Sequence, residues 1–586
     1  MIFLKHFRHY YIKYGIAFLL GIVLLILIDW YQLEIPRMMG IIVDGVESGS
    51  INHAAQMFDP ILYISIIVFG ITIGRFLWRY LLFGNGRKIE SDIRMHMFDH
   101  ATKLSQSFYS HEKIGGLMSY FINDLNSVRE VFGFGLLMLV DGLVLGGIVL
   151  YRMFSMDWVM TLYAAIPLTL MGILVFILEM RMEKKFKVRQ ESFEKMSDFA
   201  QESFTGITVI KAYVKEIKEA LSFKKKSQDV YDKSMAFMKY NVMVNILIDV
   251  MISLVIFAIL IYGAVLIANN DMTSGKLTTY IGYFFTLLWP VFAISWFLMI
   301  NGQAQASAKR IYKFLEAPID VKDAEDAIID ATLDGAITVK NLSFTYPDAE
   351  TPILKDISFS IKSGEMVGIL GKTGSGKSTL VELLLHVYNT NPDMIYFNDI
   401  DISKLSIKTL RNHIGYVPQD NFLYSDTIKN NIGFAFETID DDYLVEIAKL
   451  SDIHENVIEF KDQYETLLGE RGVTVSGGQK QRISIARALA KDPAILILDD
   501  SVSAVDTKTE EAIISNLKKV RKGKTTLMIA HRISTVRKLD KIVLLDQGEL
   551  VGFGTHKELL KNNELYQDMV KRQELEALVE EGEVNA

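Results

Sequence analysis

Residues 371–378 read Gly-Lys-Thr-Gly-Ser-Gly-Lys-Ser, and this stretch decides the fold expected for the second half of the chain. It follows at once on a short apolar strand expected at 366–370 and runs into a helical Leu-Val-Glu-Leu-Leu-Leu segment at 380–385. A glycine-rich loop between a strand and a helix has the form of a phosphate-binding loop. Its glycines let backbone amides close around phosphate oxygens, and the positive end of the helix dipole favours their charge.

The residues of this loop predict an ATP site that includes Mg²⁺. Lys377 is placed to reach the β- and γ-phosphates, and the Ser378 hydroxyl is placed to hold the metal ion. A second apolar strand at 494–498 ends in Asp499, and an acid at the tip of a buried strand beside such a loop is the usual ligand of the Mg²⁺ water shell. The ATP-binding residues expected in the loop are Gly371, Lys372, Thr373, Gly374, Ser375, Gly376, Lys377, Ser378 and Thr379.

A second anion-binding terminus lies between the loop and this acid. Ser476, Gly477, Gly478 and Gln479 stand directly before a helical segment at 483–489. Ser and two Gly at the start of a helix leave backbone amides free to face an anion. One nucleotide needs only one phosphate loop, so we expect the second terminus to serve another nucleotide.

Composition sets limits on what else the chain does. With 586 residues, the chain is too long for a single hydrophobic core, so we expect two or more domains. Half of the residues are hydrophobic, which suits a protein that lies partly in lipid. The formal net charge of -8 argues against nucleic acid as a partner. The absence of cysteine excludes disulfides, thiol catalysis and thiolate metal sites.

The front half contains six apolar stretches long enough to cross a bilayer, which takes about 20 residues. The expected spans are 14–36, 60–83, 131–151, 158–179, 242–268 and 277–301. The two long connections carry most of the Lys and Arg, which places these connections and both termini in the cytoplasm. Helical periodicity continues into them, so we expect the helices to extend below the membrane and the turns at 110–116 and 205–208 to contact the soluble domain.

Two acids, Asp141 and Asp249, lie inside predicted spans. A carboxylate there is costly, so each is expected to face protein or a water-filled cavity. A hydrogen bond between helices, an interfacial position or a role in substrate binding would each explain them. Both are therefore candidates for a membrane cavity.

Taken together, these features make the whole chain resemble a half-transporter of the ABC exporter family, with the membrane part and the ATPase fused in that order. Residues 475–479 resemble the family signature LSGGQ, with Val475 in place of Leu. Tyr346 matches the aromatic residue that stacks on adenine in the family, and Gln419 matches the loop residue that senses Mg²⁺ and contacts the membrane domain. His531 matches the switch histidine at the γ-phosphate. Two further motifs match, the exporter-specific X-loop at Glu470, Arg471 and Gly472 and the D-loop at Ser503, Ala504, Val505 and Asp506.

The resemblance implies a multidomain fold. An all-α transmembrane domain of six helices at 1–310 is followed by a linker at 311–335, an α/β P-loop ATPase domain at 336–575 and an acidic C-terminal tail at 576–586. It also implies that two ATPase domains pack head to tail, each ATP lying between one chain's phosphate loop and the other chain's signature. The chain would then have to dimerise, and ATP binding would turn the cavity outward. A bacterial plasma membrane is the implied location.

One position departs from the family pattern. Most members have Glu directly after the strand-end Asp, where it polarises the attacking water, and this chain has Asp500. The side chain is one methylene shorter, and a misplacement of about 1 Å in a catalytic group can cost about 100-fold in rate. We therefore expect slow hydrolysis by the catalytic set Asp500, Gln419 and His531. The alternative is that Asp500 reaches the water through a small backbone shift or an extra water molecule.

This substitution resembles the degenerate-site subunit, of the BmrC and LmrC type, of heterodimeric bacterial multidrug exporters. It implies a partner half-transporter that carries the Glu and uses the intact signature of this chain. Export of amphipathic drugs is the leading expectation, with membrane lipid around the protein and no nucleic acid. Export of a peptide or lipid would use the same fold and ATP chemistry. An ATP-gated channel or sensor partner would bind ATP without pumping.

Overall fold

The computed structural model describes residues 7–112, 114–469, 472, 474–501, 507–530 and 532–584. They form two compact units. The first unit combines Met1–His100 with Gly115–Glu316, and the second combines Ala101–Ile114 with Ala317–Ala586. A short piece from the front half of the sequence, Ala101–Ile114, therefore folds with the back half.

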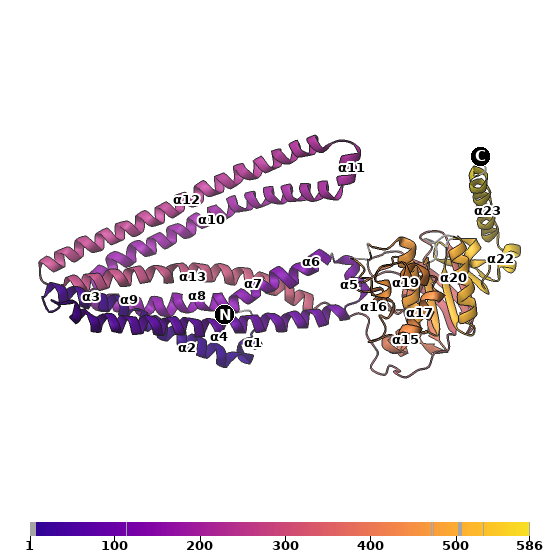
Figure 1. The fold of residues 1–586 in the computed structure, drawn as a ribbon, viewed down its shortest axis with the longest axis horizontal. Coiled ribbons are helices and arrows are strands. Elements are labelled where there is room, and N and C mark those ends of the chain that lie inside the picture. Colours follow the sequence, from indigo (N-terminus) through magenta and orange to yellow (C-terminus); the bar gives the residue numbers. More distant parts are fainter. Residues whose placement is uncertain are drawn as a thin grey trace. The chain divides into compact units, whose positions relative to one another are not determined.

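The first unit is entirely helical in its described part (Figure 1). Its elements are α1 His9–Lys13, α2 Gly15–Gln32, α3 Glu34–Glu47, η2 Ala54–Met57, α4 Phe58–Lys103, α6 Ile114–Ser119, η3 Tyr120–Asp124, α7 Leu125–Glu130, η4 Val131–Gly135, α8 Leu136–Val140, η5 Asp141–Leu145, α9 Gly146–Met156, α10 Trp158–Thr205, α11 Ile207–Ala212, α12 Glu216–Ala268 and α13 Ser274–Leu315. Five helical runs are long and apolar enough to cross a membrane, and Trp158–Leu174 in α10 forms a shorter apolar segment. The six predicted spans all fall on these helices.

The third of the long runs, Ile114–Met156, is not a uniform α-helix. It is interrupted by three π turns, η3, η4 and η5, and the last of them begins at Asp141. A π turn inserts an extra residue into an α-helix and is frequent at functional sites. The apolar stretch at 131–151 predicts a regular span, and these turns were not predicted from the sequence.

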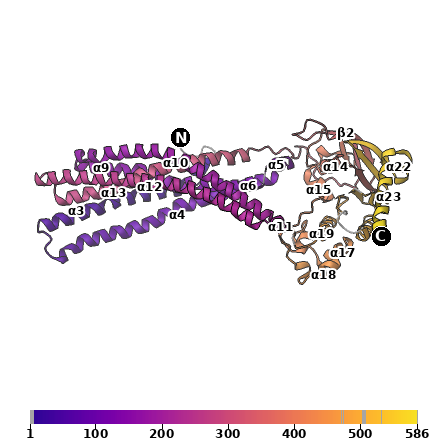
Figure 2. The same ribbon diagram turned by 90° about the horizontal axis from the view of Figure 1, so that it is seen from above.

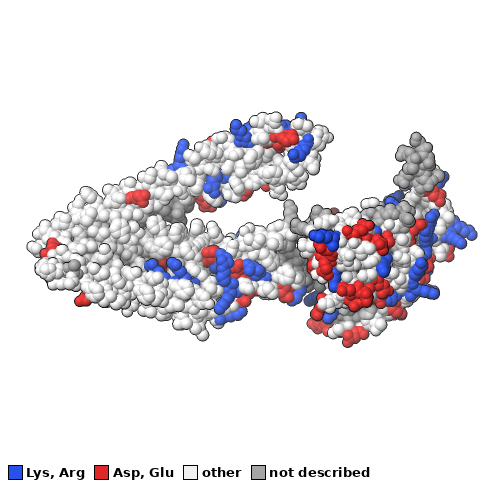
Figure 3. Space-filling view, viewed as in Figure 1, with Lys and Arg blue, Asp and Glu red and all other residues white. Residues whose placement is uncertain are grey.

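Helices α10 and α12 form a long pair that is joined at α11 (Figures 1 and 2). With 48 residues, α10 extends over about 72 Å at 1.5 Å per residue, well beyond the roughly 30 Å of a hydrocarbon core. Lys and Arg side chains gather on this pair toward α11, whereas its opposite end is nearly free of charge (Figure 3). This distribution fits helices that leave the membrane on the side of α11.

The second unit is built on two sheets. Its strands are β1 Ile337–Phe344, β2 Leu354–Ile361, β3 Met366–Gly371, β4 Ile395–Phe397, β5 Ile400–Asp401, β6 Ile414–Val417, β7 Ile495–Asp499, β8 Thr525–Ile529, β9 Lys541–Asp546 and β10 Glu549–Gly554. The antiparallel sheet has the order β2-β1-β4-β5. The larger sheet has the order β10-β9-β3-β8-β7-β6, in which all neighbours except β10 and β9 are parallel. All five residues of β7 are buried, as expected for a parallel strand covered on both faces.

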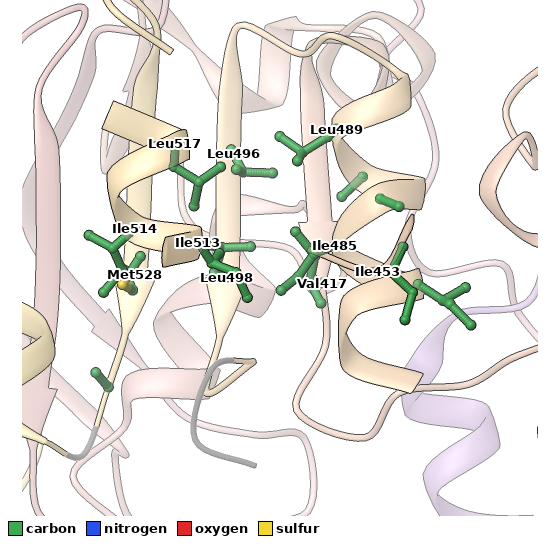
Figure 4. Packing of buried hydrophobic residues seen from close by; sticks show 14 of the residues in the cluster. Val417, Ile453, Ile485, Leu489, Leu496, Leu498, Ile513, Ile514, Leu517 and Met528 are labelled. Atoms are coloured by element: carbon green, nitrogen blue, oxygen red, sulfur yellow. The ribbon is translucent and has the colours of Figure 1, made fainter. Parts of the chain in front are cut away.

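The described part of this unit also contains helices and short 3-10 turns. They are α5 Gln106–His111, α14 Lys377–Leu384, η6 Ile402–Lys404, α15 Ile407–His413, α16 Ile428–Ile432, α17 Asp441–Leu450, α18 His454–Ile458, η7 Gln463–Glu465, α19 Gly477–Ala490, α20 Thr507–Val520, α21 Ile533–Val536, α22 His556–Asn562 and α23 Glu564–Val584. Ile485 of α19, Ile513 of α20 and Leu498 of β7 belong to one buried hydrophobic cluster (Figure 4). This core fixes where β7 ends and so positions Asp499. The predicted tail at 576–586 continues as the end of α23 up to Val584.

Candidate functional site: a nucleotide pocket and a membrane cavity

The phosphate loop leaves β3 at the carboxyl edge of the larger sheet. Two of its glycines have left-handed backbones, with φ of +82° at Gly374 and +94° at Gly376. Side chains other than glycine rarely adopt that conformation. A Cβ at Gly376 would also lie 2.4 Å from Cδ2 of Leu354, so this turn of the loop needs glycine for two separate reasons.

A pocket of about 360 Å³ opens at this edge. The residues that line it are Tyr346, Ile353, Thr373, Gly374, Gly376, Lys377, Ser378, Thr379, Gln419, Asp499, Asp500 and Ile529. They come from the loop, from the ends of β6, β7 and β8, and from the segment after β1. Gly371, Lys372 and Ser375, which were also predicted to bind ATP, belong to the loop without lining the pocket.

Lys377 lies buried at the floor of the pocket. Its Nζ donates hydrogen bonds of 2.9 Å to the carbonyl oxygens of Gly371 and Lys372. Burial lowers the pKa of Lys377, and the nearby charges of Asp499 and Asp500 oppose that change. The amine is thus held in the loop by two carbonyl oxygens, and a bound phosphate would add an anion in direct contact with it.

Asp499 ends β7 beside the loop. Burial raises the pKa of its carboxyl to about 6, and a hydrogen bond with the Ser378 side chain opposes the rise. Ser378, Asp499 and Gln419 all line the pocket and offer only oxygen atoms or an amide. Mg²⁺ prefers such oxygen ligands and completes its octahedron with water and phosphate, so the donor set fits this ion.

Asp500 lines the same pocket from the residue after β7. Its backbone is left-handed, with φ of +46°, and its amide donates to the carbonyl oxygen of Ile529 at 3.2 Å. Asp tolerates this conformation better than most residues with a side chain, because its short polar group can hydrogen-bond locally. The short side chain at Asp500 is therefore compatible with the local backbone as well as with the pocket.

Tyr346 forms the side wall of the pocket beyond β1. Its hydroxyl bonds with the Thr379 hydroxyl and donates to the Glu382 carboxylate, both at 2.9 Å. Its ring meets those of Phe344 and Tyr388 edge-on, at centroid distances of 5.1 and 5.2 Å. These contacts fix the ring of Tyr346 at the wall of the pocket, where a base could stack on it.

The second anion-binding terminus lies elsewhere on this unit. Ser476 caps α19: its hydroxyl accepts from the Gln479 amide at 3.3 Å, and the Gln479 side chain accepts from the Ser476 amide at 2.9 Å. The Ser476 and Gly477 positions are exposed. Among the described residues that line the nucleotide pocket, none comes from 476–479.

Several predicted motif residues fall outside the described part of the chain. They are His531, Glu470, Arg471 and the D-loop residues Ser503, Ala504, Val505 and Asp506. The roles expected for these residues from the sequence therefore stay predictions.

A second, larger cavity lies in the helical unit. It has a volume of about 730 Å³ and is lined from α2, α4, the run from η4 to η5, and α13. Of the two acids predicted for a membrane cavity, Asp141 lines it, whereas Asp249 lies exposed on α12 and is absent from its described wall. Sequence reasoning missed Asp29, which also lines the cavity. Its signal was a carboxylate within the first predicted span, 14–36.

Two regions of the chain match known families. Residues 18–291 match the ABC transporter transmembrane region, and residues 354–503 match the family described as ABC transporter. A solved bacterial Atm1-family ABC exporter with ATP bound has a TM-score of 0.77 to this chain, with 24% identity, over 95% of this chain and 98% of that one. The predicted fold class, a helical transmembrane domain followed by an α/β ATPase domain, is confirmed.

Full-length relatives are also similar in sequence. The probable multidrug resistance ABC transporter ATP-binding/permease protein YheI of Bacillus subtilis (strain 168) is 36% identical over 570 residues, which cover 97% of this chain and 96% of YheI. The multidrug resistance-like ATP-binding protein MdlA of Escherichia coli (strain K12) is 33% identical over 567 residues, covering 96% of this chain and 95% of MdlA.

Proposed function

This chain belongs to the ABC transporter family, and from that premise we propose that it is one subunit of a heterodimeric exporter of amphipathic drugs. Membership makes it an ATPase coupled to transport. It is a multi-pass exporter of a bacterial cell membrane, with its ATPase domain in the cytoplasm. The heterodimer, the impaired ATP site and the drug substrate are the parts that we add.

The observation that carries the proposal is the separation of two nucleotide-binding elements within one ATPase domain. The pocket at Lys377 has its own loop, acid and aromatic wall, whereas the capped terminus at Ser476 lies exposed outside it. A helix terminus with free amides gains most when an anion faces it. A second ATPase domain would bring its own bound nucleotide to Ser476 and complete both sites.

The presence of Asp500 in place of the usual Glu favours a heterodimer over a homodimer of two identical chains. When Mg²⁺ and ATP are bound, Ser378, Asp499 and Gln419 would hold the metal ion, which supplies charge neutralisation at the phosphates. Asp500 would then orient the attacking water with a side chain shorter than the usual Glu. We propose that this site holds ATP and turns it over slowly, while the signature of this chain serves a faster site on the partner.

Two observations favour an amphipathic drug as the substrate. Of the relatives named above, YheI is described as a probable multidrug resistance transporter and MdlA as a multidrug resistance-like protein. The membrane cavity also has a volume within the range of about 300–1,000 Å³ that holds drug-sized ligands, and it has aromatic walls. Export of a peptide or lipid would require the same ATPase cycle and stays the second candidate.

The proposal is tested with the full-length chain and the partner half-transporter that we expect in the neighbouring reading frame. Cells that produce both chains should expel ethidium or Hoechst dye in an ATP-dependent way, and cells with either chain alone should not. The purified pair should hydrolyse ATP, and replacing the partner's catalytic Glu by Gln should remove most of that activity. Full, drug-stimulated ATPase activity of this chain as a homodimer would contradict the heterodimer.

A further inference from the structure

The helix pair α10 and α12 has a charged part, which consists of residues 181–205 of α10 and 216–241 of α12 (Figures 1 and 3). Among the described side chains of this charged part, only that of Ser192 is buried, at 6% exposure. Most of the stability of a helix in a protein comes from the packing of an apolar face. The charged part has no such core within this chain, so other contacts hold its two helices together.

Ionic and ring contacts join the two helices there. The Ser192 hydroxyl of α10 donates to the Asp229 carboxylate of α12, and Lys233 of α12 bonds the same carboxylate at 2.8 Å. Nearer to α11, the ammonium group of Lys226 lies 5.2 Å from the centre of the Phe199 ring. These contacts hold the two antiparallel helices in one register.

Arg189 lies between one ring of each helix. Its guanidinium is 4.6 Å from the centre of the Phe186 ring of α10 and 5.0 Å from the centre of the Phe237 ring of α12. The centres of the two rings are 5.9 Å apart. A planar guanidinium is attracted to ring faces by their quadrupole, and more strongly where water is partly excluded. Because Arg189 is half-buried, its side chain links α10 to α12 more firmly than an exposed contact would.

This link lies at the membrane end of the charged part. Phe237 comes shortly before the predicted span 242–268, whereas the turn at 205–208, at the other end of the pair, is the segment predicted to contact a soluble domain. Close-packed interiors transmit strain from one element to another. Since the charged part has no such interior, a displacement at the turn reaches the spans only if side-chain links keep α10 and α12 from sliding past each other.

We propose that Arg189 is a positioning residue for ATP-driven transport. By contacting Phe186 and Phe237 at once, it fixes α10 against α12, so that a movement at α11 is passed on to the spans. Removing the guanidinium should uncouple the spans from ATP. It should leave the nucleotide pocket unchanged, because neither helix contributes to the described lining of that pocket.

The test follows the ATP-driven movement of the membrane helices in the assembled full-length transporter, with a partner chain that is also free of cysteine. Because this chain contains no cysteine, Asn52→Cys and Asp271→Cys place two spin labels at exposed positions, at the end of the helical unit opposite α11. ATP with vanadate should change the distribution of distances between the labels. In Arg189→Gln the ATP-induced population should fall about fivefold relative to the resting one, as expected for the loss of one cation–π contact. ATP hydrolysis without drug should stay at the wild-type rate.

Variants of Phe237 separate the ring contact from local packing. Phe237→Leu removes the ring face but keeps an apolar side chain, so it should reproduce the loss in Arg189→Gln, whereas Phe237→Tyr keeps the ring and should behave like the wild type. Combining Arg189→Gln with Phe237→Leu should cost no more than Arg189→Gln alone, because both remove the same contact. Lys187→Gln is the matched control, since the ion pair of Lys187 with Glu183, at 2.9 Å, stays within α10.

Three results would overturn the proposal. The first is a wild-type response of the labels in Arg189→Gln. The second is an equal loss in Phe237→Tyr and Phe237→Leu, because the ring face would then not be the cause. The third is a loss in Lys187→Gln as large as that in Arg189→Gln. If Arg189→Gln does not assemble, the comparison of the two Phe237 variants still decides.

The label readout needs no drug, which keeps this inference separate from the proposed substrate. A label response to ATP that depends on Arg189, without dye efflux from cells, would remove the drug-export proposal and leave this inference standing. Dye efflux that continues at the wild-type rate in Arg189→Gln would do the opposite.

Discussion

The imidazole Nε2 of His111 lies 2.6 Å from Oδ2 of Asp348, within the compact unit that carries the nucleotide pocket. The other ring nitrogen lies 2.7 Å from the carbonyl oxygen of Ser107. Both neighbours are acceptors, so both contacts are satisfied only by the protonated ring. Asp348 stands two residues after Tyr346, and the contact therefore links the segment Ala101–Ile114 to the wall of the pocket.

This pair predicts a pH-dependent attachment of the segment. The pKa of His111 is raised above its ordinary value of 6.5 by its hydrogen bond with the Ser107 carbonyl and by the charge of Asp348. The contact therefore contributes fully below about pH 6.5 and is lost as the pH rises through the raised pKa. Because both side chains are exposed, the effect is small.

Hydrogen-exchange protection factors of residues 101–112 in the full-length chain should fall between pH 6 and pH 8, on the order of a few fold. His111→Gln should remove that dependence. His413→Gln is the control, because His413 lies in the same unit and its Nδ1 contacts the Thr409 carbonyl of its own helix. An unchanged pH dependence in His111→Gln would exclude the pair as its source.

The substitution Asp500→Glu tests the impaired site. Restoring the longer side chain should raise ATP hydrolysis at this pocket by about tenfold to 100-fold, because it corrects a displacement of about 1 Å. The assay uses the heterodimer whose partner carries Gln for its catalytic Glu, so that only this pocket turns over. Asp500→Asn, which removes the charge without adding length, should not raise the rate. A wild-type rate in Asp500→Glu would mean that Asp500 already reaches the water.

Much of the nucleotide site could be predicted because its parts are local. The loop 371–378 needs only the adjacent strand and helix, and parallel strands bring Asp499 and Gln419 to the same edge as that loop. The membrane cavity could not be predicted in this way. Asp29 and Asp141 line the same cavity only because their helices pack together. Neither apolar stretch contains a pattern that predicts which helix lies beside it. The contact of His111 with Asp348 likewise depends on tertiary structure alone.

Lys377→Ala should weaken ATP binding at this pocket. The lysine is the buried cation of the loop, and the loss of a hydrogen bond to a charged group costs about 1.5–3 kcal/mol, which corresponds to about 10- to 150-fold in affinity. Binding of a fluorescent ATP analogue is measured with the partner's own loop lysine replaced. Lys372→Ala is the control, since Lys372 is exposed and its side chain is outside the described pocket lining. Equal losses of affinity in the two variants would show that the net positive charge of the loop, and not the buried position of Lys377, determines ATP binding.

Gly376→Ala should destabilise the chain more than Gly374→Ala. Both positions have left-handed backbones, so each substitution carries about 1–2 kcal/mol of backbone strain. The added Cβ at position 376 would also lie 2.4 Å from Cδ2 of Leu354, whereas position 374 has open space around it. Thermal unfolding of the two full-length variants measures the difference. Equal unfolding temperatures would show that Leu354 moves aside without cost.

Gly477→Ala tests whether the signature contacts the partner's nucleotide, because it should change the ATPase rate without lowering the stability of the chain. A Cβ at this position meets nothing within 4 Å in the chain, and Ala is favoured over Gly in a helix by about 1 kcal/mol, so stability should be unchanged or slightly higher. The ATPase rate of the assembled transporter should nevertheless fall, by about 100-fold, because the methyl group would displace the partner's nucleotide by about 1 Å. Ser476→Ala provides the contrast, since it removes the cap of α19 and should cost about 1 kcal/mol of stability. If Gly477→Ala left both stability and turnover untouched, the exposed terminus would not face a nucleotide, and the reason for requiring a second ATPase domain would be lost.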